Sequence, residues 1–566
     1  MPYDLVIRNG SIVDGSGAPA YLADLGVVDG RIACIGRIPE KGADNIDAEG
    51  HVVAPGFVDG HTHMDAQVFW DPIGSCSCYH GITSVVMGNC GFTLAPCRES
   101  EADLVFRNLE RAEDISRKAM LAGIRWRWES YPEYLDVLET LPKGINYAGY
   151  IGHSALRTYV MGERAFTESA SDDDLARMCA TVQQAVRAGA IGFSTSRTPN
   201  HETSDHKPVA SRIAEWNEVR AIVNAMRETG AGMFEIAGEP DPDNTGDYQR
   251  RLQALCLESG APITWGLFSS RQSPDRWRRS LALLDTTAAE GGQMFAQVHS
   301  RALNVLYTFE SYTPLDPWYV WRDIRALPLA EQKAKLRDPA IKAELVDVAG
   351  RPSERHARRG VHLPPPDWDW IFIMDSMSSE KERRMSEVAA ERGVPPAELM
   401  INLGLESDFK VFFRKPLNND VDDHVLEMML HPQTVVTFSD SGAHVSQIMD
   451  SSLQTHVFSH WVREKQALTV EQAVRMVTSV PARRWGLTDR GLLRPGHAAD
   501  VTVFDPATIA PRMPEVVHDL PGGGRRFKQV ADGIKATVVN GEVLLRDNVH
   551  TGAASGQLLR GPLAAA

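Results

Sequence analysis

The stretch PGFVDGHTHMD, residues 55–65, decides what fold and chemistry to expect of this chain. Its apolar start predicts a short buried strand that ends near Gly60. His61 and His63 follow two positions apart, so both imidazoles would lie on one face of the extended chain. A bare pair of this kind also occurs in exposed turns, but two imidazoles on one face suit a single divalent metal ion. The stretch therefore indicates a strand that ends in a metal site.

Eight short apolar segments, the first of them at 54–63, alternate with amphipathic helical stretches. The others are residues 82–90, 146–154, 190–196, 231–239, 262–268, 293–300 and 434–442. This alternation is typical of parallel sheets built from βαβ units. It predicts an α/β fold, a (β/α)8 TIM-like barrel over residues 55–484 with helical insertions around 302–433. The active site of such a barrel lies at the C-terminal ends of its strands.

The two ends of the chain carry a different pattern. Residues 3–53, 494–506 and 534–545 contain short β-branched runs that end at Asn-Gly, Asp-Gly or Gly, which is the chemistry of tight hairpins. We expect one small β-sandwich domain formed by both termini, residues 1–54 plus 485–566, with the barrel inserted between them.

Composition narrows the class of partner. The 566 residues include 59 basic and 74 acidic side chains, a formal charge of −15, which disfavours nucleic acid and anionic membranes. No stretch approaches the roughly 20 apolar residues that span a bilayer, and no basic start precedes an apolar run. Seven cysteines, an odd number, argue against a disulfide framework. The sequence predicts a cytoplasmic protein that acts on a small molecule.

A third metal-binding candidate comes from the eighth predicted strand. In a closed barrel the first and eighth strands are neighbours, so Asp440 would lie beside His61 and His63. Two histidines and one carboxylate leave coordination positions open for water, as a catalytic metal site requires.

At this point a resemblance becomes visible. PGFVDGHTHMD, GITSVVMGNCG (81–91), SDSGAH (439–444) and RPGHAADVTVFDP (494–506) together resemble the amidohydrolase superfamily, whose barrel is of the metal-dependent hydrolase type. Cys90, after Gly-Asn, points to the N-acyl-D-amino-acid deacylase branch. The resemblance spans nearly the whole chain. It implies one or two Zn²⁺ ions held by His61, His63, Asp440 and Cys90, with Asp440 also acting as general base and acid.

Two positions depart from the pattern of that branch. Its fifth and sixth barrel strands each end in a zinc-binding histidine, and the corresponding residues here are Glu235 and Leu267. Leucine binds no metal. Either Glu235, His299 or His153 replaces the missing ligand, or the centre holds one ion on His61, His63 and Asp440. Glu235 has an alternative role, which is to pair with an arginine near the barrel mouth.

The substrate candidates lie after the third, fourth and seventh strands. They are His153 and Arg157 in IGHSALR, then Arg197, His201, His206 and Lys207 in the loop at 196–211, and His299. The loop after the fourth strand would offer an anion-binding cluster, or else it is a solvated polar loop. His153 or His299 would also help to stabilise the oxyanion, which makes His153 a catalytic candidate beside Asp440.

These features predict a zinc-dependent amidohydrolase acting on carbon–nitrogen bonds other than peptide bonds. The expected reaction is deacylation of an N-acyl-D-amino acid or a related N-acyl compound by metal-activated water. Hydrolysis of a cyclic amide, imide or lactone is the first alternative, and a non-catalytic barrel used as a binding module is the second. The predicted partner is a small-molecule amide, and a homo-oligomer is compatible with the sequence.

Overall fold

The computed structural model describes residues 3–239, 246–351, 366–377 and 382–565. At its centre, eight parallel strands follow each other in chain order around one sheet. They are β6 (Phe57–Asp59), β7 (Ile82–Met87), β8 (Asn146–Gly152), β9 (Gly192–Ser196), β10 (Met233–Ala237), β11 (Ile263–Gly266), β12 (Met294–Val298) and β17 (Thr434–Val436). Each lies within one of the eight predicted segments, which confirms the predicted barrel.

The first and last strands meet through backbone contacts just beyond their ends. Thr62 and Ser441 form an isolated parallel bridge, and the N–H of His63 donates to the carbonyl of Ser441 at 2.8 Å. The N–H of Asp440 donates to the carbonyl of His61 at 3.2 Å. These contacts close the ring and bring the segment that carries the two histidines against the segment that carries Asp440.

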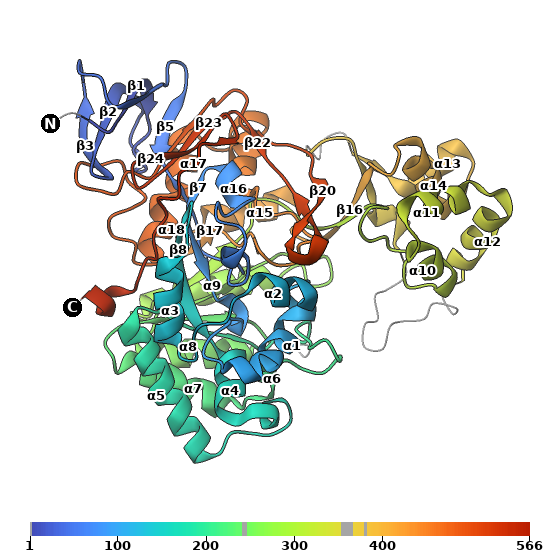
Figure 1. The fold of residues 1–566 in the computed structure, drawn as a ribbon, viewed down its shortest axis with the longest axis horizontal. Helices are drawn as coiled ribbons and strands as arrows, with labels where there is room; N and C mark the ends of the chain where they lie inside the picture. Colours follow the sequence, from blue (N-terminus) through green and yellow to red (C-terminus); the bar gives the residue numbers. More distant parts are fainter. Residues whose placement is uncertain (1–2, 240–245, 352–365, 378–381, 566) are drawn as a thin grey trace.

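Helices surround the barrel (Figure 1). They are α1 (Ala102–Ala112), α2 (Arg117–Gly123), α3 (Tyr131–Thr140), α4 (His153–Met161), α5 (Asp172–Ala188), α6 (Ala210–Ile213), α7 (Trp216–Arg227), α8 (Asp247–Ser259), α9 (Arg276–Ala289), α15 (Asp422–Leu430), α16 (Leu453–His456), α17 (Val470–Val477) and α18 (Ser479–Arg484). Helix α5 illustrates how the sequence sets the helix ends. Ser171 and Asp174 form a capping box at its start, and Gly189 ends it. No helix among the described residues is long and apolar enough to cross a membrane.

Both termini contribute to a separate nine-stranded sheet. Its strands are β1 (Leu5–Ile12), β2 (Tyr21–Val28), β3 (Arg31–Gly36), β4 (Asp44–Asp47), β5 (Val52–Pro55), β18 (Val501–Phe504), β23 (Ile534–Val539), β24 (Glu542–Arg546) and β25 (Val549–His550). The antiparallel pairing of β5 with β18 joins the N-terminal and C-terminal strands into one continuous sheet with a core of its own. Two small ribbons follow β18, formed by β19 (Ala510–Pro511) with β22 (Ala531–Asp532) and by β20 (Glu515–Leu520) with β21 (Gly524–Lys528).

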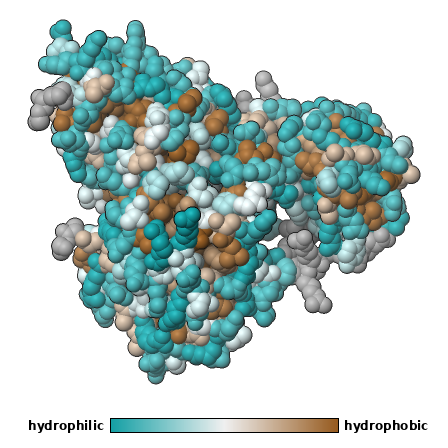
Figure 2. Space-filling model, in the orientation of Figure 1, coloured by the Kyte–Doolittle hydropathy of each residue, from teal (hydrophilic) through white to brown (hydrophobic). Residues whose placement is uncertain are grey.

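The long insertion forms a lobe at the right of Figure 1. It contains α10 (Tyr319–Arg325), α11 (Leu329–Arg337), α12 (Pro339–Ala349), α13 (Met385–Arg392), α14 (Pro396–Glu406), β13 (Leu303–Tyr307), β14 (Phe372–Met374), β15 (Arg383–Arg384) and β16 (Phe412–Asn418). The sequence analysis predicted helical insertions here; the lobe contains helices and, in addition, a four-stranded sheet that the sequence analysis did not predict. A core around Phe309, Trp318 and Trp321 holds the lobe together. Hydrophilic residues cover most of the face shown in Figure 2, with small hydrophobic groups between them.

Candidate metal centre

Four potential metal ligands converge at the C-terminal ends of the barrel strands. The ligand atoms of His61, His63 and Cys90 lie within 4.8 Å of one another, and all three residues are buried. Oδ1 of Asp440 lies 3.4 Å from Nε2 of His61 and 3.5 Å from Nε2 of His63. Sγ of Cys90 lies 3.5 Å from Nε2 of His61. A tetrahedral ion with ligands at about 2.0–2.3 Å separates its donors by roughly 3.3–3.7 Å. These three donor pairs have that spacing.

The backbone of residues 88–91 explains how a cysteine reaches the centre. Cys90 has a φ of 55°, and the flanking Gly88 and Gly91 have φ values of 77° and 78°. A Cβ on Gly91 would lie 3.1 Å from the Cα of Thr195, so glycine also allows a close approach to β9. Three left-handed residues within four positions turn the chain sharply at the end of β7. The Gly-Asn-Cys-Gly sequence thus places the thiol beside the two imidazoles.

Each histidine has a polar partner on the ring nitrogen opposite Nε2. Nδ1 of His61 lies 2.7 Å from Oε1 of Gln297, whose amide nitrogen donates to Thr264 at 3.1 Å. Nδ1 of His63 lies 3.5 Å from Oε2 of Glu113, which is buried. Partners of this kind orient metal-ligating histidines. Sequence reasoning missed both; Gln297 had the weak signal of an amide inside an apolar strand, and Glu113 had none.

The electrostatics of the cluster favour a cation. Burial lowers the pKa of His61 to about 3. Burial would also lower the pKa of His63, but Glu113 and Asp440 raise it to about 9. Burial would raise the pKa of Asp440, yet the hydrogen bond from His63 and the charges of His61 and His63 hold it below its ordinary value. Glu113 and Asp440 therefore stabilise a positive charge at His63, which a divalent ion could supply in place of the proton.

Glu235 lies next to this cluster on β10. Its Oε2 accepts a hydrogen bond from the N–H of Cys90 at 2.7 Å, and its Oε1 has no hydrogen-bond partner among the described residues. Burial raises the pKa of Glu235 to about 8. The alternative of an arginine pair is not what the described residues show, because Arg197 pairs with Glu239 at 2.7 Å.

The position of the missing sixth-strand ligand is filled by apolar groups. Leu267 is buried, and the neighbouring Phe268 packs edge-on against Phe438. Phe438 in turn stacks on the ring of His61, with centroids 3.8 Å apart. His299 is buried beside both phenylalanines, and neither of its ring nitrogens has a partner among the described residues. It lies near the centre but outside the group of three clustered ligands.

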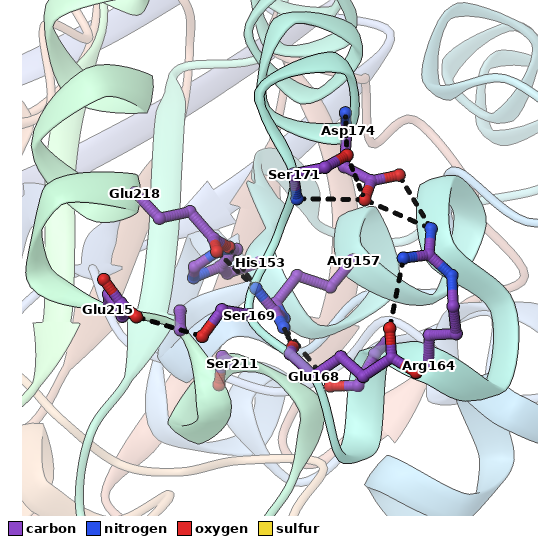
Figure 3. A network of polar contacts seen from close by, with 12 residues as sticks. His153, Arg157, Arg164, Glu168, Ser169, Ser171, Asp174, Ser211, Glu215 and Glu218 are labelled. Carbon is purple, nitrogen blue, oxygen red and sulfur yellow. Dashed lines mark hydrogen bonds and ion pairs between the residues drawn. The ribbon is translucent and has the colours of Figure 1, made fainter.

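His153 and Arg157 share a carboxylate partner away from the clustered ligands (Figure 3). Nδ1 of His153 lies 2.8 Å from Oγ1 of Thr195, and Nε2 lies 2.8 Å from Oε1 of Glu218. Arg157, fully buried, forms an ion pair with the same Glu218 carboxylate and donates to the carbonyl of Glu168. Both ring nitrogens of His153 and both terminal nitrogens of Arg157 are thus engaged within the protein, and the two residues link α4 to α7.

In the loop after β9, one residue lies close to the metal centre. Burial lowers the pKa of His201 to about 3, with further lowering by the charges of His444 and His63. The His201 ring lies 5.1 Å from that of Phe92, and its Nδ1 contacts Oγ of Ser196 at 2.7 Å. The Arg197 guanidinium is held by Glu239 and by the carbonyl of Ala214. Lys207 pairs with Asp205 at 3.2 Å, and His206 is half-buried.

Barrel, terminal sheet and buried ligand cluster together define a metal-dependent hydrolase architecture. The amidohydrolase family matches residues 44–545, and the chain belongs to this family. It is 27% identical to the D-aminoacylase of Alcaligenes xylosoxydans xylosoxydans, over 99% of this chain and 98% of that protein. It is also 27% identical to an uncharacterized Mycobacterium tuberculosis protein, over 96% of this chain and 92% of that one.

Solved structures share the fold. The N-acyl-D-glutamate deacylase from Bordetella bronchiseptica, complexed with zinc and a phosphonate inhibitor, has a TM-score of 0.67 and 24% identity, covering 99% of this chain and 100% of that one. A D-aminoacylase structure has a TM-score of 0.64 and 22% identity, with the same coverage. The resemblance to the deacylase branch is thereby confirmed.

Proposed function

We propose that this protein is a metal-dependent amidohydrolase that deacylates N-acyl-D-amino acids. The observation that carries the proposal is the buried cluster of His61, His63 and Cys90 at the barrel mouth, with Oδ1 of Asp440 within 3.5 Å of both imidazoles. Relatives that align over almost the whole chain, named D-aminoacylase, N-acyl-D-aspartate deacylase and N-acyl-D-glutamate deacylase, support the substrate class.

The donor set fits zinc. Two imidazoles, a thiol and a carboxylate are ligands that this borderline-soft ion prefers. Nε2 of His61 lies at tetrahedral donor spacing from both Sγ of Cys90 and Oδ1 of Asp440. Burial and the nearby charges of Glu235 and Asp440 raise the pKa of the Cys90 thiol well above its usual value, and a coordinated thiol is deprotonated outright. Zinc bound there supplies Lewis-acid activation of water and of the substrate carbonyl. We also propose Glu235 as a ligand of a second ion, because its Oε1 has no other partner among the described residues.

Asp440 carries the proton transfer in this proposal. Its Oδ1 lies within 3.5 Å of both histidine Nε2 atoms, which places it beside the position that a metal-bound water would occupy in this proposal. The carboxylate accepts a proton from the attacking water and then delivers it to the leaving nitrogen, which departs as the amine. Phe268 and Phe438 line the same region with apolar surface, which limits access of bulk water to the reacting bond.

His201 and His299 are the remaining candidates for contacts with the substrate. Both lie near Asp440, whose charge acts on the pKa of each. Burial is the main cause that lowers both pKa values, so both rings are neutral at pH 7 and each offers one N–H donor to a carbonyl or carboxylate oxygen. Arg197 and His206 remain predictions as substrate contacts, and the ion pair with Glu239 makes Arg197 the less available donor.

The test is amine release from N-acetyl-D-methionine by protein that has been stripped with a chelator and then titrated with Zn²⁺. We expect turnover to disappear on stripping and to return with about one ion per chain. Dihydrouracil, a cyclic amide, serves as the comparison substrate. Turnover of the cyclic amide alone, from the zinc-loaded protein, would assign the site to ring opening instead.

A further inference from the structure

The end of helix α1 contacts the metal centre in two ways. Glu113 directly follows α1 and is 1% exposed, and its Oε2 lies 3.5 Å from Nδ1 of His63. Among the described residues neither of these two atoms has a hydrogen-bond partner. The two atoms thus lie within ion-pair distance of each other, and neither is engaged in a hydrogen bond elsewhere among those residues.

The same helix end also holds the loop that carries Asp440. The carbonyl of Glu113 accepts a hydrogen bond from the N–H of His444 at 2.6 Å. The neighbouring Asp114 accepts from the N–H of Ser446 at 3.1 Å and from its hydroxyl at 2.6 Å. Residues 113–114 thus contact both the first-strand histidine and the loop after the eighth strand.

We propose that Glu113 is a positioning residue of the metal centre, acting through His63; this rests on the metal site of the proposed function. A carboxylate beside Nδ1 favours a proton on that nitrogen, so Nε2, 3.5 Å from Oδ1 of Asp440, is the nitrogen that a metal ion would take. The negative charge also makes the imidazole a stronger electron donor toward a cation.

Packing alone does not explain a glutamate at this position. A buried carboxylate oxygen without a partner is costly, and an apolar side chain of similar size would avoid that cost. Among the described residues the one ion pair of Glu113 is with His63 of the centre. The charge of Glu113 is therefore directed at the metal site.

The test compares zinc affinity, measured by competition with a chromophoric chelator, in wild type, Glu113→Gln and Glu113→Leu. We expect Glu113→Leu to bind zinc roughly 10–100-fold more weakly, and Glu113→Gln to fall between, since its amide oxygen still accepts from Nδ1. Glu110→Gln, one turn earlier on α1, is the matched control and should bind like wild type. The absorption spectrum of the Co²⁺-loaded forms reports ligand geometry and should change only in the Glu113 variants.

Wild-type zinc affinity and an unchanged Co²⁺ spectrum in folded Glu113→Leu would overturn the proposal. If Glu113→Leu does not fold, the same result in Glu113→Gln would overturn it. The outcome is separate from the proposed function: a wild type that binds zinc but hydrolyses no amide would contradict the deacylase activity, while graded affinities in the Glu113 series would still support the positioning role.

Discussion

Gln297, on the seventh barrel strand, accepts a hydrogen bond at 2.7 Å from Nδ1 of His61, which follows the first strand. The amide nitrogen of Gln297 donates to Oγ1 of Thr264, so the amide oxygen of Gln297 faces the imidazole. That oxygen can only accept a hydrogen bond. The proton of His61 is therefore on Nδ1. Its Nε2 lone pair is left for a metal ion, next to Cys90 and Asp440.

Replacing Gln297 by leucine should weaken metal binding and leave the protein folded. We expect zinc affinity to fall by roughly 10–100-fold, because the tautomer and orientation of His61 are no longer set. Gln297→Glu should keep the acceptor and retain more affinity than leucine. Chelator competition measures both, and equal affinities in wild type and Gln297→Leu would show that His61 is oriented by other contacts.

Mutations should distinguish the metal-binding role of the two histidines from the proton-transfer role of Asp440. His61→Ala and His63→Ala should lose bound metal and activity together, since each removes one of the few nitrogen donors of the site. Asp440→Asn should keep much of its metal and lose about 100-fold or more in turnover, because an amide cannot accept the proton. Metal content per chain and amide turnover, measured on the same preparations, test this. An asparagine variant with full activity would remove Asp440 from proton transfer.

The group formed by His153, Arg157 and Glu218 should matter for stability instead of catalysis. Glu218→Gln leaves the fully buried Arg157 without its counter-charge, which costs about 3–5 kcal/mol of unfolding free energy. Glu215→Gln, at the start of the same helix, removes an exposed charge but keeps an oxygen that can accept from Ser169, and should stay within about 0.5 kcal/mol. Urea unfolding measures both. A Glu218→Gln protein of wild-type stability but altered KM would restore this group to the substrate site.

His80 should make the fold sensitive to acid. It is fully buried outside the metal centre, its Nδ1 contacts Oγ1 of Thr455, and burial lowers its pKa from 6.5 to about 3. Between pH 6.5 and about 3, His80 is therefore protonated in the unfolded chain and neutral in the folded protein. The stability that the neutral, buried ring allows is complete above pH 6.5 and is lost as the pH falls.

The variant that tests this is His80→Gln, which keeps a polar partner for Thr455 without a titrating group. Between pH 8 and pH 5 the unfolding free energy of wild type should fall by about 2 kcal/mol more than that of the variant, at about 1.4 kcal/mol per pH unit below pH 6.5. His550→Gln, at an exposed histidine, is the control. Parallel pH profiles of wild type and His80→Gln would contradict the prediction.

The parts of the site that follow from strand order were predictable from sequence. The alternation of strands and helices is a local pattern, and it located all eight barrel strands. Barrel closure then predicts that Asp440 lies beside the two histidines, and its Oδ1 is within 3.5 Å of both. Cys90 needed the resemblance to a known branch, because nothing in its local sequence indicates the left-handed turn that directs it inward.

The features that the sequence did not predict depend on contacts between residues far apart in the chain. His153 and Arg157 stand at the end of a barrel strand, as substrate contacts would, but Glu218 occupies their polar atoms from a helix more than 60 residues away. Glu113 lies after a helix, where barrel rules predict no catalytic role. The strands of the inserted lobe are short and pair across long intervals, so no local periodicity marked them.

The central claim is tested most directly by measuring amine release from matched N-acetyl-D- and N-acetyl-L-amino acids by the zinc-loaded protein, with and without chelator. We predict chelator-sensitive turnover of the D-series and little or none of the L-series. Protein that retains its zinc yet releases no amine from any N-acetyl-D-amino acid would contradict the assignment.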